Sequence, residues 1–112
     1  MIAAMAACGG STAHVPTIGD LMDRLASAGI VCTNRSSVRP DVLANKQPAF
    51  QLCVPSAKVS SELMLFAAPT SAGLLSLTNS EPSGAVVAAA GTTWQVVAMN
   101  SPDAAIVRGL LG

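Results

Sequence analysis

Residues 17–32 read TIGDLMDRLASAGIVC, which combines a complete helix signal with a cysteine soon after it. Thr17 is a favoured N-cap residue, and Asp20 follows three residues later, where a negative charge stabilises the first turn. Gly29 is a common helix terminator. The spacing predicts a helix over residues 17–28 whose buried face comprises Ile18, Leu21, Met22 and Leu25.

Cys32 has one natural partner in the body of the chain, Cys53, which lies 21 positions later. The pair has no CxxC spacing and no histidine nearby, so it does not indicate a zinc site. We expect a disulfide that joins the end of the first helix to a strand and stabilises the fold by roughly 3 kcal/mol. The alternative is a pair of reduced, buried thiols in a cytosolic protein.

Hydrophobic periodicity and turn residues predict the elements that follow. Residues 33–48 are polar and contain two prolines, which indicates a loop with room for one helical turn. The order α-β-β-α-β(β)-α predicts a single α+β domain over residues 17–112, in which three helices pack on one face of a small antiparallel sheet of three or four strands. The predicted strands cover residues 49–54, 59–67, 85–89 and 93–99, and the predicted later helices cover residues 69–78 and 101–111.

Two strands carry specific side-chain expectations. Phe50, Leu52 and Val54 fall on alternate positions, so they are expected on one face of the first strand, opposite Cys53. Trp94 is the only tryptophan, and we expect it to be the largest side chain of the core.

The closing helix has a clear start signal. Ser101 is the expected N-cap, Pro102 the first helical residue and Asp103 part of the first turn. Its apolar stripe is predicted to comprise Ile106, Val107, Leu110 and Leu111.

The first residues differ from ordinary domain sequence. Residues 1–8 read MIAAMAAC and resemble the end of a secretory signal, and residues 5–8 resemble a bacterial lipobox, in which the cysteine thiol takes a diacylglycerol. We therefore expect a truncated signal over residues 1–8, lipidation at Cys8 and a flexible tether over residues 9–16. Only seven uncharged residues precede Cys8, so the alternatives are a start further upstream or an alanine-rich terminus with a chance cysteine.

Composition and charge disfavour several function classes. The formal net charge is zero and charged residues make up 11% of the chain, so no basic field favours a nucleic-acid partner. His14 is the only histidine and falls in the tether, so no catalytic pair, metal site or cofactor is expected. The apolar runs fall short of the roughly 18 residues that span a bilayer. We expect a protein that is not an enzyme.

One local charge asymmetry suggests an interaction surface. Four of the six basic residues lie in a span that contains a single acidic residue, Asp41. Near a membrane, such a loop would suit anionic headgroups or an acidic partner. The alternative is a solvated polar loop. The candidate partner surface comprises Arg35, Arg39, Lys46 and Lys58.

Five short motifs together suggest a family resemblance. The motifs are CGGS at 8–11, AGIVC at 28–32, FQLCV at 50–54, TWQVV at 93–97 and GLLG at 109–112. With them the chain resembles small lipoproteins and secreted domains of unknown function from actinobacteria and their phages. The resemblance implies an anchored, disulfide-bonded α+β domain and carries no catalytic residues.

These expectations rank three function classes. The first is an extracytoplasmic lipoprotein, held to membrane lipid through acylated Cys8, that presents its domain to an envelope or phage partner. Exclusion of superinfecting phage is the specific version if the gene is phage-borne, and it rests on analogy. The second is a soluble secreted binding or inhibitory module without a lipid anchor. An enzyme ranks third.

Overall fold

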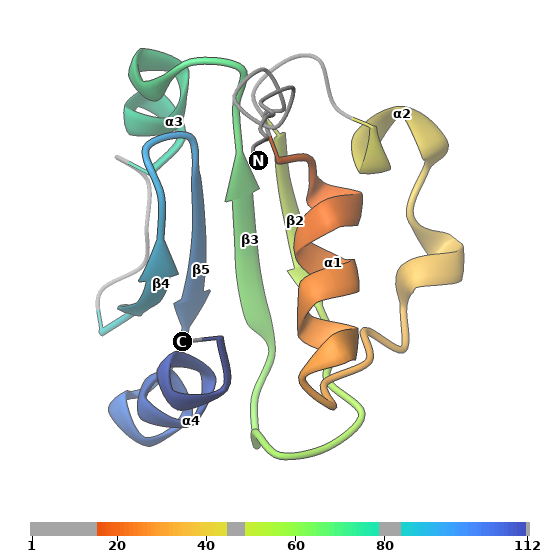
Figure 1. Ribbon diagram of the computed structural model, residues 1–112, viewed down its shortest axis with the longest axis vertical. Coiled ribbons are helices and arrows are strands. Elements are labelled where there is room, and N and C mark those ends of the chain that lie inside the picture. The colour runs from red at the N-terminus through yellow and green to blue at the C-terminus, as the bar shows by residue number, and fades with distance from the viewer. Residues whose placement is uncertain (1–15, 45–48, 79–83, 112) are drawn as a thin grey trace, which may run out of the picture.

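A four-stranded antiparallel sheet forms the centre of the computed structural model, which describes residues 16–44, 49–78 and 84–111 (Figure 1). The strands are β2 (Ala49–Cys53), β3 (Leu63–Ala67), β4 (Val86–Ala90) and β5 (Trp94–Ala98). Their spatial order is β2-β3-β5-β4, so the two predicted antiparallel pairs meet through β3 and β5. The predicted α+β class and antiparallel sheet are confirmed.

The helices include the three that were predicted and one short addition. The loop after the first helix contains two helical turns rather than one, a 3-10 turn and a one-turn α-helix. The helices are α1 (Ile18–Ser27), α2 (Pro40–Leu43), α3 (Ser71–Thr78) and α4 (Ser101–Leu111), and the 3-10 turn η2 covers Arg35–Ser37.

Both faces of the sheet are covered by helices, and the expectation of one covered face is wrong. Every residue of β3 is buried, so this central strand needs apolar neighbours on both sides. Leu63 and Leu65 join the main core with side chains of α1 and α4, which lie on one face (Figure 1). Met64 and Phe66 point the other way and pack with residues of α3 in a second cluster.

Local signals set both ends of α1 as predicted. Thr17 Oγ1 accepts a hydrogen bond from Asp20 N at 3.1 Å, and Asp20 Oδ2 accepts one from Thr17 N at 2.9 Å, which completes a capping box. Gly29 follows the helix with a φ of 95°, a left-handed conformation that favours glycine. Ile30 N donates to Leu25 O at 2.8 Å, so the helix ends in a Schellman motif.

Replacing Thr17 by alanine is expected to lower the free energy of unfolding by about 1 kcal/mol, because Asp20 N loses its acceptor. Thr17→Ser keeps the oxygen and is expected to stay close to the wild type. Chemical denaturation measures both. Equal stability of the alanine and serine variants would contradict a stabilising cap.

The face of β2 that carries Ala49 and Cys53 points into the main core. Cys53 is 0% exposed, whereas Phe50 is 46% exposed and Val54 lies just beyond the strand. Leu52 is half-buried against the second cluster, and Phe50 packs on Phe66 with ring centroids 5.1 Å apart. The predicted alternation holds for Phe50 and Leu52, which contact the second cluster, and for Cys53, which lies on the opposite face in the main core.

The start of α4 lies one residue earlier than predicted. Asn100, not Ser101, is the N-cap, since Asn100 Oδ1 accepts a hydrogen bond from Asp103 N at 2.9 Å. The predicted stripe is buried only in part. Val107 is fully buried, but Ile106 and the exposed Leu110 lie outside the core.

Candidate functional site

A disulfide between Cys32 and Cys53 attaches the segment after α1 to the edge strand β2, as predicted. The two Cα atoms lie 5.0 Å apart, and the residues are 4% and 0% exposed. Thr33 N donates to Val54 O at 2.8 Å, and Ser56 N donates to Val31 O at 2.9 Å, so backbone hydrogen bonds surround the covalent link.

Asn34 covers the backbone beside this disulfide. Its Nδ2 donates to Leu52 O at 2.9 Å, and its Oδ1 accepts from Val54 N at 3.0 Å. One amide side chain therefore pairs with a donor and an acceptor on the outer edge of the β2 segment, where another chain could otherwise add a strand. Sequence reasoning missed Asn34, because an asparagine in a polar loop carries no signal for a contact with a later strand.

The candidate basic surface is partly neutralised. Arg35 forms an ion pair with Asp23 of α1, and Arg39 Nη2 lies 2.7 Å from Asp41 Oδ2. Lys58 lies in the loop between β2 and β3 with a φ of 74°. The fourth member, Lys46, falls outside the described residues, as do Cys8 and His14. Of the described members, two arginines therefore face aspartates, and sequence reasoning overlooked Asp23 because it precedes the basic span.

A buried carboxylate connects the loop before β3 to the start of α4. Asp103 is 3% exposed and accepts hydrogen bonds from Ser60 N at 3.1 Å, Ser61 N at 3.1 Å and Ser61 Oγ at 2.7 Å. Asn100 Nδ2 also donates to it at 3.3 Å. The Ser61 hydroxyl bond, reinforced by the other donors from Ser60 and Ser61, outweighs burial and lowers the pKa of Asp103. A carboxylate so saturated is a poor general base and is suited to a structural role.

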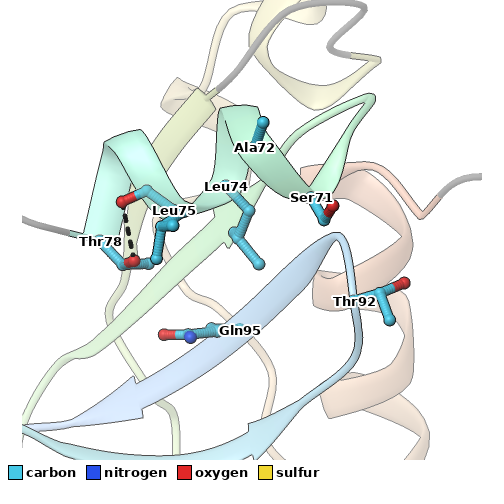
Figure 2. A pocket seen from close by; sticks show the side chains of 7 residues that line it. All are labelled: Ser71, Ala72, Leu74, Leu75, Thr78, Thr92 and Gln95. Atoms are coloured by element: carbon cyan, nitrogen blue, oxygen red, sulfur yellow. Dashed lines mark hydrogen bonds between the residues drawn. The ribbon is translucent and has the colours of Figure 1, made fainter.

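A surface hollow of about 350 Å³ lies between α3 and the β4–β5 hairpin (Figure 2). Leu74 points from α3 towards the sheet, while Leu75 is 65% exposed at the rim. Gln95 Oε1 is buried and accepts no hydrogen bond from the described residues. The side chains that line the hollow are Ser71, Ala72, Leu74, Leu75, Thr78, Thr92 and Gln95.

This hollow is mostly apolar and has one unsatisfied acceptor at its floor. An unpaired buried carbonyl oxygen costs roughly 1–3 kcal/mol, so a ligand that donated a hydrogen bond to Gln95 Oε1 would gain binding free energy. The oxygen is sealed from solvent, however, so a ligand reaches it only after a rim side chain moves. The hollow is a weak candidate for a preformed binding site.

Trp94, expected to be the largest side chain of the core, packs against the main core but is only half-buried at its margin. The Arg24 guanidinium of α1 lies 5.0 Å from the centre of its ring. Gly91 begins the turn between β4 and β5, and a Cβ added there would overlap the indole Nε1 of Trp94. The hairpin therefore requires glycine at this position for the indole to lie where it does.

Residues 16–44, 49–78 and 84–111 contain no group of three His, Cys, Asp or Glu side chains that could hold a metal ion. No helix in this part of the chain is long and apolar enough to cross a bilayer.

No family model matches the sequence, and neither the curated proteins nor the solved structures contain a significant match.

Proposed function

We propose that this protein is a non-enzymatic binding domain that works outside the cytoplasm and is held to the membrane through an acylated Cys8. The observation that carries the proposal is the buried Cys32–Cys53 disulfide. Structural disulfides persist in oxidising compartments and are rare in the cytosol of mesophiles. A domain of this size buries only a modest core, so a covalent link contributes a useful share of the stability.

The described polar clusters support a role in presentation rather than in catalysis. Asp103 accepts hydrogen bonds that hold α4 against the loop before β3, and Asn34 hydrogen-bonds to the backbone of the edge strand β2. Arg35 and Arg39 each face an aspartate. These side chains hold parts of the domain together, and an envelope or phage partner would bind the surface of that domain.

Mass spectrometry of the protein isolated from its native cells tests the proposal. We expect a diacylglycerol on Cys8, no alkylatable thiol at Cys32 or Cys53, and recovery in the membrane fraction. Cys8→Ala is expected to release the protein into the soluble extracytoplasmic fraction with the disulfide intact.

The possible results separate the two versions of this function. An unmodified Cys8 in a soluble extracytoplasmic protein would overturn the anchor and leave the secreted binding module. Free thiols at both Cys32 and Cys53 of the native protein would overturn the proposed location outside the cytoplasm.

A further inference from the structure

Helices α1 and α4 lie on the face of the sheet that carries the main core (Figure 1). Two adjoining hollows lie between them and together form a groove. One hollow of about 340 Å³ lies beside β4 and the start of β5. A second hollow of about 270 Å³ shares Arg24 and Leu111 with it and continues along Ser27, Ala28 and Leu110. The first hollow is lined by Arg24, Ala88, Ala89, Ala90, Trp94, Arg108 and Leu111.

Two arginines line this groove without a carboxylate partner among the described residues. Arg24 contacts the face of Trp94, and Arg108 Nη2 donates to Val87 O at 2.9 Å. Each guanidinium has five N–H donors, so most of them are left for a ligand. Arg35 and Arg39 differ, since aspartates of the chain itself neutralise both.

The rest of the groove lining is apolar and consists largely of short side chains. Three successive alanines of β4 supply short side chains, and Ala88 is buried at the floor. Trp94 and Leu111 provide apolar contact area beside the charges. An apolar group would fit over the alanines while an anionic group met the guanidinium donors.

We infer that the groove binds the C-terminal residue of a partner peptide, with the terminal carboxylate between Arg24 and Arg108 and an apolar side chain against Trp94. Guanidinium groups match the planar carboxylate, and capture of a free carboxylate is a recurring mode of peptide recognition. The second hollow lies along the same helices, which favours a peptide over a small free acid because there is room for a preceding residue. The inference rests on the proposed binding role and names its ligand class.

Trp94 is the only tryptophan, so its fluorescence and its indole N–H signal in NMR both report on the groove. The probes are acetyl-Ala-Ala-Leu with a free carboxylate, the same peptide as an amide, N-acetylleucine and inorganic phosphate. We expect saturable binding of the free acid and binding of the amide weaker by about tenfold or more. We expect N-acetylleucine to bind more weakly than the peptide.

Arg24→Gln and Arg108→Gln remove one charge each and leave a shorter, neutral polar side chain. Each is expected to weaken binding of the peptide acid by about fivefold or more, with an unchanged far-UV circular dichroism spectrum. Arg39→Gln is the matched control, because Arg39 lies outside the groove and pairs with Asp41, and it is expected to leave binding unchanged.

Equal affinity for the peptide acid and its amide would overturn the inference, as would phosphate or N-acetylleucine binding as tightly as the peptide. So would a loss of affinity in Arg39→Gln equal to that in the groove variants. Finally, the absence of a saturable change in the Trp94 signal at millimolar peptide would overturn it. The experiment uses purified, oxidised protein and does not depend on Cys8. If the groove binds the peptide but the native protein carries no acyl group on Cys8, only the proposed membrane anchor is refuted. If the native protein is acylated but the groove does not bind the peptide, only the proposed ligand is refuted.

Discussion

Asp103→Asn is expected to lower the free energy of unfolding by about 2–4 kcal/mol, because the new amide N–H₂ would face groups that already donate. Ser60 N, Ser61 N and the Ser61 hydroxyl all donate to this carboxylate, which is 3% exposed. The variant therefore leaves buried donors without an acceptor and loosens the loop before β3 from α4. Urea denaturation measures the loss, and Asp41→Asn is the matched control, since Asp41 is an exposed aspartate in an ion pair.

The same substitution is expected to change how stability depends on pH. The pKa of Asp103 is lowered in the folded protein, so its ionised form favours folding. This contribution is present above the unfolded pKa of about 4 and is lost as pH falls through the lower folded pKa. The difference between wild type and Asp103→Asn should therefore shrink below about pH 4. A stability loss no larger than that of Asp41→Asn, or a difference that grows in acid, would contradict this account.

Removal of the disulfide is expected to lower the free energy of unfolding by about 3 kcal/mol in the chain-entropy model. Cys32 and Cys53 are separated by 21 positions, so the bond restricts the unfolded chain over a long loop. The double variant Cys32→Ala and Cys53→Ala also loses packing beneath α1, since both residues belong to the main core.

Denaturation of the oxidised wild type, the reduced wild type and the double alanine variant measures this effect. The reduced protein should lose about 3 kcal/mol and the double alanine variant more, because the variant also loses side-chain packing in the main core. Cys8→Ala should retain the stability of the oxidised wild type. A loss below about 1 kcal/mol in both thiol-free states would show that backbone hydrogen bonds around the disulfide hold the segment alone.

The successful sequence predictions rest on short-range signals. The Thr17 cap, the Gly29 terminator and the apolar spacing of α1 act within a few residues, so they could be recognised before any fold was known. Strand alternation and turn residues located both hairpins for the same reason. The cysteine pair was predicted because only two cysteines fall within the folded body of the chain.

The sequence by itself was enough to predict the α+β class, the order of the main helices and strands, and the pairing of Cys32 with Cys53. Only the tertiary structure decided which distant side chains meet. Asp103 contacts Ser60 across 43 positions, and Arg24 of α1 reaches Trp94 of β5. These contacts depend on the strand order β2-β3-β5-β4 and on helices covering both faces, and no local periodicity encodes that arrangement. The candidate groove is therefore a product of packing, because its arginines and its tryptophan lie on three separate elements.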